Sequence, residues 1–213
     1  MLGQLLIGLG AALLLNRPSR LLEAIRALFI IPMVLPPIVV AIIWKVLFTP
    51  DISVLNWLLG LAHLPQPAWL AEPRLALPAI IVADIWEWFP FTLLMLLAAL
   101  QIMPPEPIEA ARIDGAGTWQ VFRHVVLPLL RPTIVVTVLF RLIESVKAFP
   151  LIFIMTGGGP GTVTEATNYY AFLQGFTYSL LGFSAAISVV VLAGTFLLSY
   201  AIVRWVGTQV DVE

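Results

Sequence analysis

Five long apolar stretches, separated by short charged or proline-rich segments, dominate the sequence. They consist mainly of Leu, Ile, Val, Ala and Phe and cover residues 2–15, 27–48, 76–102, 129–153 and 182–205. A bilayer core about 30 Å thick needs about 20 such residues per helix. A soluble domain could not bury the apolar surface of a chain that is 61% hydrophobic and 11% charged. The pattern predicts an all-α polytopic membrane protein with five transmembrane helices in one domain, residues 1–206, and a short tail, 207–213.

Charge and cysteine content exclude several other classes. The net charge is −1, and no run of Lys and Arg offers the basic face that a nucleic acid needs. The chain has no cysteine, so it has no disulfide or thiol chemistry. Its two histidines, His63 and His124, fall in loops on opposite sides of the expected topology, which argues against an intramembrane enzyme or a metal site. A passive channel remains an alternative function, and a transport assay with and without ATP would distinguish it from a driven transporter.

Basic residues set the orientation. They concentrate in two alternate loops, as Arg17, Arg20 and Arg26, and as Arg112, Arg123 and Arg131. The positive-inside rule makes both loops cytoplasmic, and Arg204 places the tail 207–213 on the same side. The segments 49–75 and 154–181, rich in Pro, Trp and Tyr, then face outward. The N-terminus is also outside, and no basic region precedes the first stretch as in an ordinary signal peptide.

The cytoplasmic loop 104–128 carries its own helical signals. Pro107 suits a helix start, and Glu106 and Glu109 complement the positive end of the helix dipole. This helix should end around Gly115 or Gly117, and a second short helix should cover about 118–125. Such a loop helix has no core of its own, so we expect it to fit a partner's groove. The alternative is an interfacial helix that lies in the lipid headgroup region.

One motif in this loop is specific. It reads Glu109-Ala110-Ala111, three residues, Gly115, nine residues, Val125, one residue, Leu127-Pro128. This resembles the EAA motif of the permease subunits of binding-protein-dependent ABC importers, with Val125 in place of Ile. Family members usually have six spans. The short first stretch therefore leaves open a natural five-span form or an upstream helix missing from this chain.

The resemblance implies a mechanism and a set of partners. Around Ala110 and Ala111, the loop would be a coupling helix seated in a separate ATPase subunit, which binds ATP and Mg. The coupling residues would be Glu109, Ala110, Ala111, Arg112, Asp114, Gly115, Leu127 and Pro128. The family pairs two permease subunits in the bacterial inner membrane with two ATPase subunits and an extracytoplasmic substrate-binding protein. The chain itself would then have no catalytic residue and no cofactor.

A second stretch, 155–176, resembles the first permease subunit of carbohydrate importers of the maltose type. It has a Thr-Gly-Gly-Gly-Pro turn at 156–160, then Thr164, Glu165 and an aromatic run. The glycines are not a phosphate loop, because no Gly-Lys-Ser/Thr ending follows. The resemblance implies sugar uptake, with glycerol phosphate or another solute as the alternative. Glu165 and Asn168 would contact the binding protein.

Ionisable residues at membrane depth are costly and mark functional candidates. Two sets recur at helical spacing and form the expected substrate path: Glu87, Trp88 and Phe91, with Asp84, in the third stretch, and Arg141, Glu144, Ser145 and Phe149, with Lys147, in the fourth. Polar groups would bind sugar hydroxyls while an aromatic ring stacks on the pyranose. A structural ion pair of Arg141 with Glu144 or Glu87 explains the same residues equally well.

Overall fold

The computed structural model describes residues 1–17 and 19–210, with side chains described up to Arg204. Every regular element in this part of the chain is a helix. The chain divides into two compact units. Unit 1 comprises residues 1–30, 89–142 and 199–213, and unit 2 comprises residues 31–88 and 143–198. The expected all-α fold is confirmed.

Three of the apolar stretches form the expected helices. They are α1 (Leu2–Leu15), α5 (Pro73–Gln101) and α11 (Leu181–Val210), each of which begins and ends within a few residues of the prediction except at the C-terminal end of α11. The other helical segments are α4 (Val54–Leu61), α6 (Glu106–Ile113), α7 (Thr118–Val121), α10 (Thr167–Phe172), the 3₁₀ turn Pro50–Ile52 and the π turns Phe122–Val126 and Leu173–Thr177.

The stretch 27–48 is expected to be one continuous helix, and the structure breaks it into two. It contains the end of α2 (Arg20–Val34) and all of α3 (Pro37–Phe48), which are bent by 97° relative to each other. The break falls at Leu35 and Pro36. Proline has no amide hydrogen to donate and disfavours a helical conformation in the residue before it, so Pro36 and Pro37 together end the first helix.

The stretch 129–153 is also interrupted. α8 (Leu127–Val146) ends before α9 (Phe149–Met155) begins. Between them the amide of Phe149 donates to the Lys147 carbonyl at 2.6 Å, and Ala148 has φ −68° and ψ 54°. These angles describe an inverse γ-turn. Pro150 follows shortly after and favours this interruption, because it has no amide to continue the hydrogen bonding of α8.

The number of full spans is smaller than predicted. Among the described residues, three helices are long and apolar enough to cross a bilayer, at 73–101, 118–146 and 181–204. A fourth span results if the bent pair α2 and α3 is counted as one. The remaining stretch, α1, is apolar but has only 14 residues, fewer than the roughly 20 that a perpendicular span requires.

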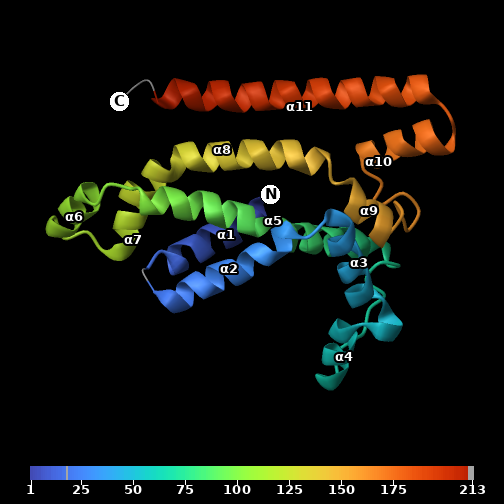
Figure 1. Cartoon of the computed structure of the whole chain (residues 1–213), viewed down its shortest axis with the longest axis horizontal. Helices are drawn as coiled ribbons and strands as arrows, with labels where there is room; N and C mark the ends of the chain where they lie inside the picture. Colours follow the sequence, from blue (N-terminus) through green and yellow to red (C-terminus); the bar gives the residue numbers. More distant parts are fainter. Residues whose placement is uncertain (18, 211–213) are drawn as a thin grey trace. The chain divides into compact units, whose positions relative to one another are not determined.

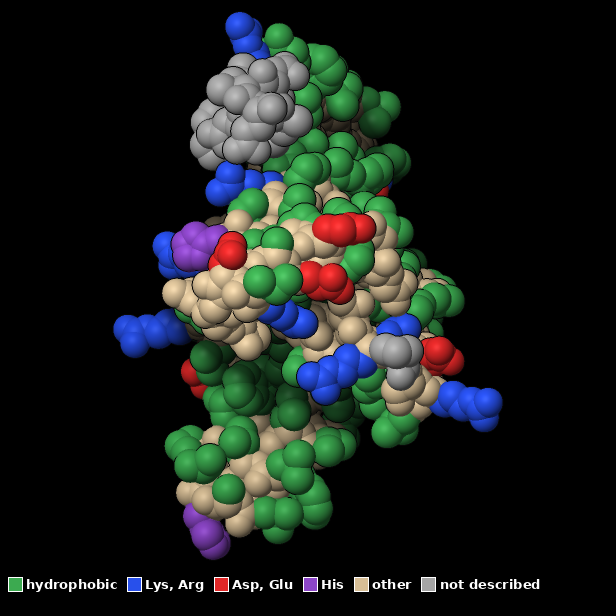
Figure 2. Space-filling model, turned by 90° about the vertical axis from the view of Figure 1, so that its left-hand side faces the viewer, with side chains coloured by type: hydrophobic (Ala, Val, Ile, Leu, Met, Phe, Trp, Pro, Cys, Tyr) green, Lys and Arg blue, Asp and Glu red, His purple; other side chains and the backbone are tan. Residues whose placement is uncertain are grey.

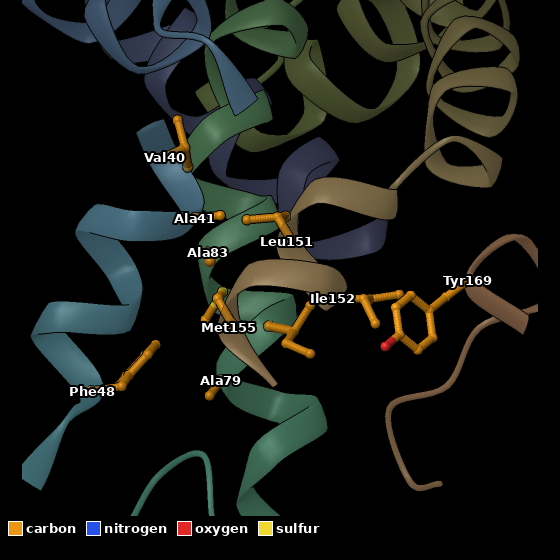
Figure 3. Packing of buried hydrophobic residues seen from close by; sticks show 10 residues of the cluster. Val40, Ala41, Phe48, Ala79, Ala83, Leu151, Ile152, Met155 and Tyr169 are labelled. Atoms are coloured by element: carbon orange, nitrogen blue, oxygen red, sulfur yellow. The ribbon is translucent and has the colours of Figure 1, made fainter. Parts of the chain in front are cut away.

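The core of unit 2 lies where α3, α5, α9 and α10 meet (Figure 3). Small residues, Ala41 of α3 and Ala79 and Ala83 of α5, are almost fully buried there and allow close approach of the helices. Leu151, Ile152 and Met155 of α9 fill the space between them, and Tyr169 of α10 closes one side.

The core of unit 1 joins α1, α5, α7, the π turn and α8. Its fully buried side chains are mostly leucines, and the cluster consists of Ala12, Leu15, Leu93, Leu96, Leu97, Leu100, Val121, Val126 and Leu130. Within this unit α6 and α7 connect the end of α5 to the start of α8 (Figure 1). The cytoplasmic loop of the sequence prediction is therefore part of a packed body.

Candidate functional site

α6 is the centre of the loop that carries the EAA motif. It begins at Glu106, one residue before the predicted start, with Pro105 at the N-cap. Glu106 and Glu109 lie in its first turn and Arg112 in its last. Both signs of charge are placed where the helix dipole favours them. The short helix expected in this loop is thus present over Glu106–Ile113.

The end of α6 depends on Gly115. This residue has φ +82°, in the left-handed region that favours glycine. Its amide donates to the Arg112 carbonyl at 3.1 Å, and the amide of Ala116 donates to the Ala111 carbonyl at 2.9 Å. Together these two bonds form a Schellman motif, which satisfies carbonyls that the helix leaves open. The predicted glycine turn is confirmed at Gly115.

The two faces of α6 differ. Ile108 and Ala111 are half-buried and pack on the core of unit 1, as does Ala116 just beyond the helix. The expectation that this helix has no core of its own is therefore wrong, because Leu100, Val121 and their neighbours lie beneath it. The opposite face consists of the exposed residues Glu109, Ala110, Arg112 and Asp114.

Exposed apolar side chains accompany these charges. Ile113 is 86% exposed and Trp119 is 66% exposed. The Trp119 ring lies 5.4 Å from that of Phe122, measured between centroids. Figure 2 looks onto this end of unit 1, where acidic and basic side chains gather among apolar ones. Exposed aromatic side chains are enriched in protein interfaces relative to the rest of the surface.

The second short helix starts as predicted and does not end as predicted. α7 begins at Thr118, and the amide of Gly117 donates to Gln120 Oε1 at 2.7 Å. It passes through the π turn Phe122–Val126 directly into α8. Leu127 and Pro128 are half-buried in the first turn of α8. A π turn widens the helix just before Pro128, which has no amide to donate.

Part of the expected substrate path lies in unit 2. Glu87 is only 2% exposed, and Trp88 and Ser145 are half-buried. Glu144 forms an ion pair with Lys147, at 2.6 Å between Oε1 and Nζ. Phe149 belongs to an aromatic cluster, with ring centroids 4.9 Å from Phe172, 5.2 Å from Phe153 and 5.9 Å from Tyr169.

The other part lies in unit 1. Arg141 is 3% exposed, and its Nε donates to Oε1 of Gln4 in α1 at 3.1 Å. Phe91 contacts Phe140 of α8 edge to face, with centroids 6.1 Å apart. Arg141 also lines a cleft of about 230 Å³ together with Thr92 and Thr137. Gln4 is not among the site residues expected from the sequence, although a polar residue inside an apolar stretch is itself a signal.

The outer glycine turn is held by hydroxyl groups. Thr164 Oγ1 donates to the Gly159 carbonyl at 2.8 Å, and the Tyr169 hydroxyl donates to the Gly157 carbonyl at 3.0 Å. The predicted tight turn is thereby confirmed. Glu165 lines an open cleft beside this turn. Asn168 instead lines a groove of about 290 Å³ with Lys147 and Ser188.

A family model described as the binding-protein-dependent transport system inner membrane component matches residues 4–211. The chain belongs to this family. It is a multi-pass membrane protein, as the sequence predicted. Among the described residues no group of His, Asp or Glu side chains is arranged to hold a metal ion.

Relatives from archaea and bacteria agree with this assignment. The chain is 35% identical to the trehalose/maltose transport system permease protein MalF of Thermococcus litoralis over 93% of its length. It is 35% identical to the sulfoquinovosyl glycerol transport system permease protein SmoG of Agrobacterium fabrum over 97% of its length. It covers 66% and 67% of those two proteins, and 59% of a probable ABC transporter permease of Sinorhizobium fredii.

The fold matches solved structures. A crystal structure of a bacterial ABC transporter involved in the import of the acidic polysaccharide alginate aligns with a TM-score of 0.80 at 23% identity. The alignment covers 95% of this chain and 72% of that chain. A second structure, of an alginate transporter in complex with an alginate-bound periplasmic protein, aligns with a TM-score of 0.72.

Proposed function

We propose that this chain is a permease subunit of an ATP-binding-cassette importer and that the exposed face of α6 docks on a separate ATPase. One observation carries the proposal. The EAA residues form a capped helix whose inner side, at Ile108 and Ala111, packs on the core of unit 1. Its outer side, at Glu109, Ala110 and Arg112, is left exposed. A helix held in this way can receive a push from a partner and pass it to the membrane helices.

The partners follow from family membership. A second permease subunit would complete the translocation path, and two ATPase subunits would bind ATP and Mg and carry out hydrolysis. This chain would then be no enzyme itself. An extracytoplasmic binding protein would deliver the solute, and Glu165 and Asn168 are the residues that we assign to that contact. The alginate transporter that shares the fold was crystallised with such a periplasmic protein.

Association with the ATPase can be tested by charge reversal. Glu109→Lys should reduce co-purification of the ATPase subunit with the permease, because the exposed face of α6 would lose its polar contact. Glu72→Lys is a matched control, since Glu72 is an exposed glutamate in the outer segment before α5. Equal recovery of the ATPase with both variants would refute the docking of α6 and would favour the headgroup alternative.

The proposed solute is a sugar or a related small polar molecule. The names of two relatives contain trehalose/maltose and sulfoquinovosyl glycerol. Glycerol phosphate was the alternative, and a phosphate group would need an uncompensated cation. Lys147 does not offer one, because Glu144 is 2.6 Å from its Nζ. We therefore propose a sugar as the transported solute.

The substrate path is proposed to involve Glu87, Trp88, Phe91, Arg141, Glu144, Ser145 and Phe149. Glu87→Ala and Arg141→Ala should each abolish uptake while the complex still assembles and keeps its basal ATPase activity. Loss of the assembled complex would instead assign these side chains a purely structural role. Uptake into proteoliposomes without ATP or an ATPase subunit would favour a passive channel.

A further inference from the structure

The outer segment between α3 and α5 has a firmly built short helix. α4 (Val54–Leu61) begins at Ser53, whose Oγ donates to the Leu47 carbonyl at 2.6 Å and accepts the Asn56 amide at 3.0 Å. The Asn56 side chain is 2% exposed. Its Nδ2 donates to the Pro67 carbonyl at 3.2 Å, and its Oδ1 accepts the Trp69 indole N–H at 2.8 Å. These bonds fix α4 to the segment that follows it.

The free side of this helix is apolar without interruption. Its exposed residues are Val54, Trp57, Leu58 and Leu61, between 50% and 62% exposed, and Leu64 beyond the helix is 53% exposed. No Asp, Glu, Lys or Arg occurs from residue 52 to residue 71. Contiguous apolar surface of this kind is rare in contact with water.

Beside the buried Asn56, the inner side of α4 also has an apolar part. Leu55 lines a cleft of about 290 Å³ together with Trp44, Phe48 and Trp69. The exposed face of α4 also continues into that of α3, where Ile38, Ile42 and Val46 are between 46% and 55% exposed. Figure 1 shows α4 beyond the end of α3, within unit 2.

We propose that α4 is an interfacial helix that lies in the headgroup and acyl boundary of the bilayer, with lipid as its partner. α5 crosses the membrane between α4 and the EAA loop, so this is the leaflet opposite to α6. Trp57 is suited to this depth, because its indole has an apolar body and one polar N–H. The segment 49–72 thereby fixes the depth and tilt of α3 and α5 from outside the helix bundle.

A binding protein is a poorer partner for this face. A protein surface that binds and releases a partner in every transport cycle has a polar, solvated rim around its buried contact residues. The free face of α4 has no charged residue, and its one polar side-chain group is the Trp57 indole N–H. Lipid contact needs no charged group, and the apolar cleft behind Leu55 adds room for part of an acyl chain.

Spin labels can test the environment of α4 directly, because the chain contains no cysteine. Leu58→Cys and Leu61→Cys are labelled in the full chain, reconstituted into nanodiscs of phosphatidylethanolamine and phosphatidylglycerol. Collision with oxygen, which enters lipid, is compared with collision with a water-soluble nickel chelate. Asp51→Cys and Glu72→Cys, at exposed charged positions that flank the segment, are the matched water-facing controls.

Lipid contact predicts a several-fold higher ratio of oxygen to nickel collisions at positions 58 and 61 than at 51 and 72. High nickel accessibility at 58 and 61 would overturn the proposal in favour of an aqueous surface. Low accessibility to both reagents would overturn it in favour of a protein partner, and so would protection that appears only when the binding protein is added. None of these outcomes depends on ATPase docking at α6.

Discussion

Gly115→Ala should loosen the end of α6 without disturbing its packing. A Cβ built on Gly115 has no heavy atom within 4 Å, so the substitution introduces no clash. The backbone, however, is at φ +82°, where an L side chain is strained. The substitution therefore isolates the contribution of the left-handed turn that closes the coupling helix.

The size of the effect follows from that angle. An L residue other than Gly, Asn or Asp in the left-handed region costs about 1–2 kcal/mol. Local opening of the turn should become more frequent by a factor of about 5 to 30, as 1–2 kcal/mol implies. The Gly115 and Ala116 amides bond to the Arg112 and Ala111 carbonyls, so they should exchange with solvent faster by this factor. Gly115→Asn should exchange more slowly than Gly115→Ala, because asparagine tolerates this conformation.

Hydrogen exchange resolved by mass spectrometry measures the opening in the purified chain, and ATP-driven uptake measures its consequence. Gly10→Ala is the matched control. It makes the same chemical change in α1, also with no heavy atom within 4 Å of the new Cβ, at a position without positive φ. It should leave the exchange of α6 and uptake unchanged.

Two results would refute this reasoning. Equal exchange at residues 115 and 116 in the Ala variant and the wild type would mean that the turn does not limit α6. If the Ala and Asn variants lose equal protection from hydrogen exchange, side-chain volume and not backbone strain is responsible. Faster exchange with unimpaired uptake would confirm that the turn limits local opening of α6. It would also show that the turn has no role in coupling.

Three further substitutions probe buried hydrogen bonds. Gln4→Ala removes the acceptor of Arg141 Nε and should destabilise unit 1 by about 1–3 kcal/mol, seen as a lower midpoint of thermal unfolding. Asn56→Ala should cost a similar amount, about 1–3 kcal/mol, and increase proteolysis and hydrogen exchange in residues 53–69 only. Tyr169→Phe loses one bond to the Gly157 carbonyl, and about 0.5–1.5 kcal/mol should appear as faster exchange in the outer turn. An unchanged midpoint or unchanged exchange would contradict the corresponding assignment.

The helices that could be predicted are those with a strong local signal. The long apolar stretches at 76–102 and 182–205 contain no feature that outweighs their helical pattern, and they form α5 and α11. The coupling helix was predicted within a residue of its start because Pro107 and Gly115 act through local geometry. That geometry is fixed by the residue itself and not by distant contacts.

The two interrupted spans show where an apolar pattern is insufficient. Pro36, Pro37 and Pro150 are visible in the sequence, and each interferes with a continuous helix at its position. Apolar composition alone predicts one continuous helix in each segment, because it takes no account of these prolines. The bond between Gln4 and Arg141 joins residues 137 positions apart. A pairing of this kind comes from packing of α1 on α8, which no local pattern encodes.

Under the proposed function, the continuous helix 118–146 and the interruption that follows it would have different roles. From Thr118 to Val146 the helix is continuous, and α6 packs against its start. A movement of the EAA loop would therefore move this membrane helix with it. The first interruption comes at Lys147 and Ala148. Non-helical backbone at membrane depth is tolerated where it is buried in protein or lines a water-filled cavity. Lys147 and Ser188 line a groove of about 290 Å³ beside this interruption, among mostly apolar side chains.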